Sequence, residues 1–321
     1  MDKDVFQKVI ALIDDLSHEQ RKLIKKALDG ENDFERVVSI IENRLATKRV
    51  CAHCESENVK KWGKSLGLQR YRCFDCGKTF NALTGSPLAF LRKKERWLQM
   101  ALALKEGLSV RKTAALCGVS VPTAFRWRHR FLRAAAADKP IKLQGIAEAD
   151  ETYFLESFKG RRQLPRPARK RGGKAFRRGL SREQIPVLVA RDRHGAVTDA
   201  VLRDQSKASI KLALGGRLGK DNILCIDGGN ALWGFVNEAK IPFKLVLSGK
   251  HVHETDPIFH IQNVNGYHHR LKNWMSRFNG VATKYLPNYL GWRRIYEKPR
   301  AVLTPTAWIQ TALERPAQHL I

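Results

Sequence analysis

The chain has 321 residues, enough for two or three domains with cores of their own, and its formal net charge at pH 7 is +28. This charge predicts a polyanionic partner. Binding to a ribosome or a membrane surface would also fit such a charge, but a hydrophobic content of 43% favours packed domains. No run of about 18 apolar residues exists to span a membrane, and the first residues lack a signal-peptide pattern, so we expect an intracellular protein whose cysteines stay reduced unless they bind metal.

Residues 1–46 are predicted to form a helical N-terminal region. Apolar residues recur there at roughly helical spacing, and Gly30 followed by Glu-Asn-Asp predicts the end of one helix and the cap of the next. An adaptor or oligomerisation segment fits this pattern, and a plain helical spacer fits it equally well.

Residues 47–85 carry two pairs of cysteines with the spacing of a zinc ribbon. Each pair has the form C-x2-C, and 18 residues separate the pairs, so a short hairpin can bring four thiolates around one tetrahedral ion. Four thiolates leave no open position, so the predicted Zn²⁺ is structural. His53 is expected to be a bystander, and Cys117 and Cys225 to be core residues. The predicted ligands are Cys51, Cys54, Cys73 and Cys76.

Residues 92–134 are predicted to form a helix-turn-helix DNA-binding domain. Gly107 ends its first helix, and Ser109 and Ser120 can cap the second and third. Trp127 and Phe131 are expected to face the core. A helical bundle with a solvated basic face is the alternative. The third helix carries the residue types that meet phosphates and base edges in a major groove, and its candidate DNA contacts are Arg126, Arg128 and Arg130.

Residues 143–295 are predicted to form one α/β domain, followed by a C-terminal tail over residues 296–321. Three strands in a meander and then alternating helices and strands are the order of a ribonuclease H-like fold. The expected elements are a strand ending at Asp150, strands at 185–190 and 197–202, a helix at 206–218, a strand at Ile223–Ile226, a helix at 230–239, a strand at 243–247 and a helix at 262–278.

A basic segment, residues 159–182, interrupts this domain. It contains eleven Lys and Arg residues and no acidic residue, and proline and glycine break it repeatedly. This composition predicts a mobile loop that is ordered, if at all, by phosphate. Its candidate DNA contacts are Arg169, Lys170 and Arg171.

Two aspartates stand out on this basic background because each is expected at the end of an apolar strand. Asp150 would end the first strand of the domain and Asp227 would follow the fourth, and those strands are neighbours in a ribonuclease H-like sheet. Carboxylates that converge from different strands can hold two divalent ions for phosphoryl chemistry. A role in a turn or a helix cap is the alternative for each aspartate.

In the order and spacing of its motifs, the chain resembles the DDE-type transposases of bacterial insertion sequences, specifically the zinc-ribbon-bearing ISXO-like group. The resemblance covers about residues 50–295. Its carriers are the two cysteine pairs, Thr84-Gly-Ser-Pro-Leu88, Ala149-Asp-Glu-Thr-Tyr153, Ile226-Asp-Gly228, the helix with Asn265 and Lys272, Gly280-Val-Ala-Thr-Lys-Tyr-Leu286 and Asn288-Tyr-Leu-Gly-Trp292.

The resemblance implies catalytic roles for Asp150, Asp227, Asn265 and Lys272. The family pattern has a third acidic residue, usually Glu, where this chain has Asn265, and a basic residue seven positions later, where it has Lys272. An amide oxygen can ligate Mg²⁺ but brings no charge, so one of the two expected Mg²⁺ (or Mn²⁺) sites should be weaker. A helix cap or a polar surface position is the alternative for Asn265.

These expectations add up to a DNA transposase that binds the terminal inverted repeats of its element, cuts a strand and joins it to target DNA. The implied partners are double-stranded DNA and further copies of the chain assembled on it, in the bacterial cytoplasm at the nucleoid. Asn265 keeps open a second interpretation, a zinc-ribbon DNA-binding regulator derived from a transposase and unable to cut. A structure-selective nuclease of the same fold would not need two DNA-reading modules.

Overall fold

The computed structural model describes residues 2–21, 32–170, 172–177, 181–246, 252–299 and 303–314. Its backbone contacts divide the chain into two compact units, Met1–Thr84 with Phe90–Gln99, and Gly85–Ala89 with Met100–Ile321. The predicted helix around Leu23 and Leu28 lies outside the described residues, as does Arg171.

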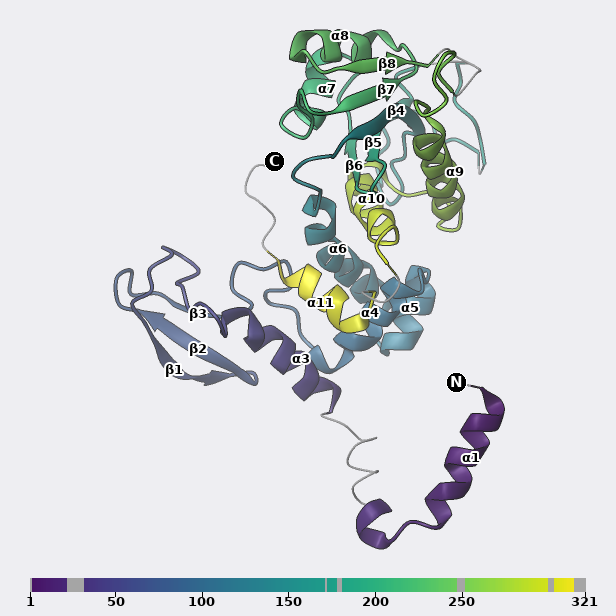
Figure 1. The fold of residues 1–321 in the computed structure, drawn as a ribbon. Helices are drawn as coiled ribbons and strands as arrows, with labels where there is room; N and C mark the ends of the chain where they lie inside the picture. The colour runs from purple at the N-terminus through teal and green to yellow at the C-terminus, as the bar shows by residue number, and fades with distance from the viewer. Residues whose placement is uncertain are drawn as a thin grey trace. The chain divides into compact units, whose positions relative to one another are not determined.

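The first unit contains a small antiparallel sheet that lies beside helix α3 (Figure 1). In the sheet order β1-β2-β3, β2 pairs with both neighbours and buries Leu68, Tyr71 and Cys73. Gly67 has a positive φ at the β1–β2 turn, and a Cβ there would meet the Phe34 ring at 2.5 Å, so this turn requires glycine. The elements are α1 (Lys3–Asp14), α3 (Asp33–Glu42), η1 (Asn43–Leu45), β1 (Val59–Ser65), β2 (Leu68–Cys73), β3 (Thr79–Asn81) and η2 (Lys94–Arg96).

The second unit combines a helical part with a five-stranded mixed sheet (Figure 1). Ser109 and Ser120 cap α5 and α6 through their side chains, as the sequence predicts. The elements are α4 (Trp97–Lys105, which begins in the first unit), α5 (Val110–Cys117), α6 (Val121–Ala137), β4 (Ile146–Leu155), β5 (Gln184–Asp192), β6 (Val197–Val201), α7 (Lys207–Leu214), β7 (Ile223–Ile226), α8 (Asn230–Ala239), β8 (Phe243–Leu245), α9 (Gln262–Ser276), η3 (Thr283–Tyr285), α10 (Leu286–Ile295) and α11 (Pro305–Leu313).

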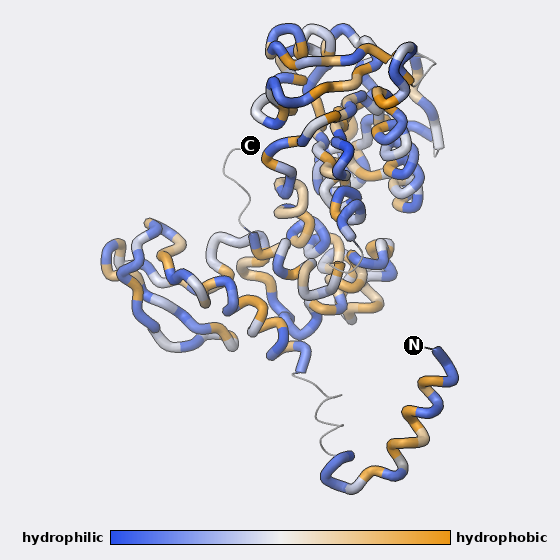
Figure 2. The backbone as a smooth tube through the Cα atoms, in the orientation of Figure 1, coloured by the Kyte–Doolittle hydropathy of each residue, from blue (hydrophilic) through white to orange (hydrophobic). Residues whose placement is uncertain are grey.

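The strand order of the large sheet is β6-β5-β4-β7-β8. The first three strands along the chain form an antiparallel meander, and β7 and β8 add in parallel beside β4. The mixed α/β class and this succession of strands follow the prediction. Alternate residues of β4, β5 and β7 pack against α7 and α8 on one face, and these strands carry long apolar stretches in Figure 2. The packed residues are Ala147, Ala149, Leu188, Ala190, Leu224 and Ile226.

Two predicted boundaries are wrong. The helix expected to run to residue 218 ends at Leu214, where Gly215 follows it. The strand that was expected to end at Asp150 continues five residues further, to Leu155, because its antiparallel pairing with β5 runs on from Asp150↔Val189 to Leu155↔Gln184. Asp150 therefore lies inside a strand. Asp227 does follow directly on β7, as predicted.

Helix α10 joins the helical part of this unit to the sheet. A Cβ on Gly291 would lie 2.4 Å from the carbonyl oxygen of Ala135, so α10 and α6 approach at backbone distance. Arg294 of α10 donates to the Ala135 carbonyl and forms a buried ion pair with Asp199 of β6. Trp292 donates to the Leu104 carbonyl at 3.0 Å. The motif Asn288-Tyr-Leu-Gly-Trp292, which carries part of the family resemblance, therefore packs α10 against the rest of this unit.

Candidate active site and metal centre

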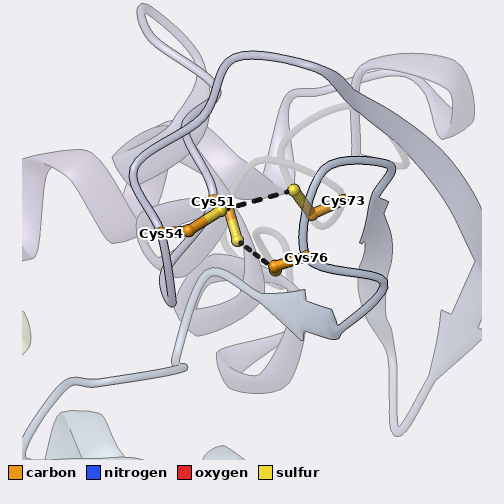
Figure 3. Close-up of side chains that lie close together, drawn as sticks. All are labelled: Cys51, Cys54, Cys73 and Cys76. Carbon is orange, nitrogen blue, oxygen red and sulfur yellow. Dashed lines mark hydrogen bonds between the residues drawn. The ribbon is translucent and has the colours of Figure 1, made fainter.

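Four cysteine side chains converge in the first unit, as Figure 3 shows. Their sulfur atoms all lie within 4.8 Å of one another, with Cys51 Sγ 3.6 Å from Cys76 Sγ and Cys54 Sγ 3.6 Å from Cys73 Sγ. Four thiolates at about 2.3 Å from a tetrahedral zinc ion would stand about 3.8 Å apart, so the cluster fits that ion.

The surroundings of the cluster explain how it forms. Cys51 and Cys73 are buried against the stacked rings of Tyr71 and Phe80, whose centroids are 5.6 Å apart. His53 contacts the carbonyl of Thr79 and is not among the converging ligands, as predicted. The four cysteines form a zinc-binding cluster, and no other group of three or more Cys, His, Asp or Glu ligands gathers as tightly in the described parts of the chain.

In the second unit, strand register brings Asp150 and Asp227 together. The parallel pair β4·β7 matches Glu148 with Cys225, and two further residues along each chain the same register sets Asp150 beside Asp227. Burial raises the pKa of Asp150 to about 6, and the Asp227 carboxylate adds to this rise. The backbone N–H of Glu151 and the charge of Lys272 act in the opposite direction and lower this pKa. The side chain of Asp227 also accepts a hydrogen bond from the backbone N–H of Gly229. Asp227 therefore also stabilises the turn after β7, which was the alternative role considered for it.

The third element at this site is α9, which packs on the face of β4 opposite α7 and α8. Asn265, His268 and Lys272 are spaced by three and four residues, so they lie on one side of the helix. His268 Nδ1 lies 3.6 Å from Asp150 Oδ2, and Lys272 is exposed and acts on the same carboxylate. Asn265 is half-buried one turn before His268.

Sequence reasoning missed two residues of this site. Burial lowers the pKa of His268 to about 4, with Lys272 adding to the effect, so the imidazole beside Asp150 is neutral at pH 7. Burial raises the pKa of Glu151 to about 7, with the Asp150 and Asp227 charges adding to it. Spacing on α9 could have pointed to His268, because it falls between Asn265 and Lys272 on their side of the helix.

A cavity of about 640 Å³ adjoins α9 beyond Lys272. The end of β4, residues of the basic loop as far as Gly173 and residues 280–286 complete its wall. Lys159 holds two sides of this wall together, because its ammonium group donates to the carbonyls of Phe278, Asn279 and Gly280. The basic loop thus lies next to the candidate active site.

The predicted DNA-contact residues differ in where the structure places them. On α6, Arg126 is exposed, whereas Arg128 is 1% exposed and donates to the Leu108 carbonyl and the Thr113 hydroxyl. Arg130 donates to the carbonyls of Pro87 and Ala89. In the loop, Arg169 pairs with Glu183, and Lys170 is exposed.

Comparison with known protein families matches the two DNA-related regions separately. Residues 91–139 match a homeodomain-like domain, and residues 142–293 match the ISXO2-like transposase domain. The chain thus carries a domain that matches the ISXO2-like transposases. It is similar to a protein of the transposable element ISH50 of Halobacterium salinarum, with 28% identity over 271 residues that cover 82% of this chain and 91% of that protein.

Two solved structures show weaker likeness. A chain of a simian T-cell lymphotropic virus intasome, solved with PP2A regulatory subunit B56 gamma, has a TM-score of 0.28 and 11% identity, covering 60% of this chain and 66% of that one. A chain of a pre-cleavage Mos1 transpososome has a TM-score of 0.24 and 12% identity, covering 93% and 96%. Scores this low establish no common fold. No described helix combines the length and apolar character that a membrane span needs.

Proposed function

We propose that this chain is a metal-dependent DNA transposase that binds the terminal inverted repeats of its element, cuts a strand at each end and transfers it to target DNA. The observation that carries the proposal is the convergence of Asp150, Asp227 and the Asn265–Lys272 side of α9, within a domain that matches the ISXO2-like transposase domain. The net charge of +28 supports a DNA partner.

The domain over residues 143–295 is ribonuclease H-like in this proposal. An antiparallel meander with two further strands added in parallel beside its first strand supports the assignment. The ribbon over 47–85 and the helix-turn-helix over 92–134 would recognise the repeats, with Arg126 directed at the bases. Further copies of the chain would pair two element ends, because each copy offers one such site.

The donor set fits Mg²⁺ or Mn²⁺. Two carboxylates and one amide oxygen are hard oxygen ligands, and burial together with the neighbouring carboxylate already raises the pKa of Asp150, a cost that a bound cation relieves. Asp150, Asp227 and Asn265 would hold up to two ions, which would neutralise charge on the phosphate and activate the attacking oxygen. Zn²⁺ would be held separately, by the four cysteines.

The residues of the chain would bind and orient the DNA strand through two successive phosphoryl-transfer reactions. In the first, a water oxygen bonds to phosphorus, the bond from phosphorus to the 3′ oxygen breaks, and a 3′-hydroxyl leaves. In the second, that hydroxyl attacks a target phosphorus and releases a target 3′-hydroxyl. Lys272 would contact the phosphate beside the cleaved bond, because it is exposed next to Asp150.

One feature favours a second candidate, a DNA-binding regulator without cutting activity: the third ligand position holds Asn265 rather than an acid. An assay of both steps separates the two functions. The purified chain is incubated with Mg²⁺ or Mn²⁺, a labelled duplex carrying the element's end, and a supercoiled plasmid. Our proposal expects a cut strand with a 3′-hydroxyl and a product joined to the plasmid. Tight binding of the duplex with no cut strand in either metal would support the regulator instead.

A further inference from the structure

Glu148 is a carboxylate that the proposed chemistry does not use, and it is 1% exposed. A buried carboxylate needs partners, because its desolvation is otherwise costly. Glu148 forms an ion pair with Arg193, and its Oε1 accepts the side-chain amide of Asn263 at 3.0 Å. Its Oε2 accepts the backbone N–H of Val264 at 2.8 Å. His260 lies nearby, and burial and Arg193 lower its pKa, which leaves Arg193 as the cation that neutralises Glu148.

These partners place Glu148 between the two elements that carry the candidate active site. On β4 it lies two residues before Asp150, so both side chains point to the same face of the sheet. On α9 it meets the first turn, where the N–H groups have no partner within the helix and the helix dipole favours a negative charge. Arg193 also donates to the carbonyl of Ile258, in the segment that leads into α9.

We propose that Glu148 is a positioning residue: it holds α9 at a fixed rotation and height against β4, so that Asn265, His268 and Lys272 face Asp150. Val264, which Glu148 binds, directly precedes Asn265. A rotation of α9 by one residue, about 100°, would turn the active side of the helix away from the carboxylates. This role rests on the proposed function, because the alignment of α9 against β4 matters for activity only if the site cleaves DNA.

Hydrogen exchange measured on the full chain by mass spectrometry tests the tether without any activity. Glu148→Gln replaces the carboxylate with an uncharged amide of nearly equal size. We expect the backbone amides of peptides that cover residues 261–268 to exchange about tenfold faster or more, because that is the effect of losing one hydrogen bond to a carboxylate. Glu238→Gln is the control, since it makes the same substitution at a carboxylate that pairs with Lys207 and Lys211 and joins α8 to α7, on the face of the sheet opposite α9. Equal exchange of this segment in Glu148→Gln and the parent would overturn the inference.

Cleavage of a labelled element-end duplex then separates positioning from stability. We expect Glu148→Gln to bind the duplex as the parent does but to cut it roughly a hundredfold more slowly per folded molecule, as a displacement of about 1 Å can cause. Glu238→Gln should cut at the parent's rate once its folded fraction is counted. Cleavage by Glu148→Gln at the parent's rate, or a loss in proportion to unfolding alone, would contradict the role.

Two further arms keep the test decisive. If Glu148→Gln does not fold, Asn263→Ala removes one donor from the exposed side of the tether and should shift exchange and cleavage in the same directions, but less; no shift in either would refute the tether. If the parent itself cuts no DNA, the proposed function fails, and the exchange result still decides whether Glu148 holds α9.

Discussion

Burial decides which arginines of α6 can meet DNA. The buried side of this helix carries Ala124, Trp127, Arg128 and Phe131 at intervals of three and four residues. The sequence already contained this period, and it would have assigned Arg128 to the interior with Trp127 and Phe131. What the sequence could not supply was the set of partners that satisfies a buried guanidinium, which are the Leu108 carbonyl, Thr113 and the Trp292 ring at 5.1 Å.

At the same helix, His129 gives the fold a dependence on pH. Its ring stacks on Tyr285 at 3.7 Å, and its Nδ1 lies 3.1 Å from the Asn288 amide. Burial lowers its pKa to about 4, and the charges of Arg128 and Lys284 add to this. Because the unfolded chain binds this proton more readily, His129 makes folding less favourable as pH falls from about 6.5 towards 4.

We therefore expect His129→Gln to be less stable than the parent at pH 7, because it lacks the stacking on Tyr285. The difference in stability between the two proteins should narrow at pH 5, because only the parent is destabilised by protonation of His129. Thermal unfolding of both proteins at the two pH values measures this. A gap that stays constant or widens on acidification would show that His129 does not titrate in this way.

At the scale of elements, the zinc ribbon was predictable because its evidence is local. Two C-x2-C pairs and a hairpin-length spacer determine the cluster almost alone. The end of β4 was not predictable in this way. The acidic residues after Ala149 suggested a strand end, but a long partner strand, β5, extends the pairing to Leu155. Pairing between distant segments overrides a local signal here.

Removal of zinc should unfold the ribbon, because so small a sheet gains much of its stability from the ion. We expect a strong chelator to abolish the ordered signal of residues 51–81 in hydrogen exchange, and added Zn²⁺ to restore it. Substitution Cys73→Ser should act as chelation does. His53→Ala is the control and should change nothing. A chain purified without chelator that contains no zinc would contradict the assignment.

The basic loop and α6 should contribute to DNA binding in different ways. Lys170→Gln and Arg161→Gln change exposed cations of the loop, and each lost phosphate contact should reduce the slope of log K against log salt by about 0.9 on any duplex. Arg126→Ala should instead weaken the preference for the element's end over random DNA. Binding titrations over a range of salt on both duplexes measure the two effects. Identical behaviour of the two sets of variants would refute the division.

At the scale of the whole molecule, the order of motifs predicted the transposase domain that residues 142–293 match, and it predicted four residues of the candidate site. Asp150, Asp227, Asn265 and Lys272 come from a strand, a strand end and a helix that lie far apart in the sequence, and the fold brings these elements together. Glu148 escaped prediction because its role depends on which side of α9 meets β4. That contact belongs to tertiary packing and leaves no local pattern.

The central claim is that the two aspartates form the cutting site, and one measurement tests it most directly. Cleavage of a labelled element-end duplex is followed against Mg²⁺ concentration for the parent, Asp150→Ala, Asp227→Ala and Asn265→Ala. We predict that either aspartate variant binds the end nearly as the parent does but cuts no strand. Asn265→Ala should cut less and need more Mg²⁺, since it loses only a neutral ligand. Cleavage by Asp150→Ala and Asp227→Ala at the parent's rate would contradict it.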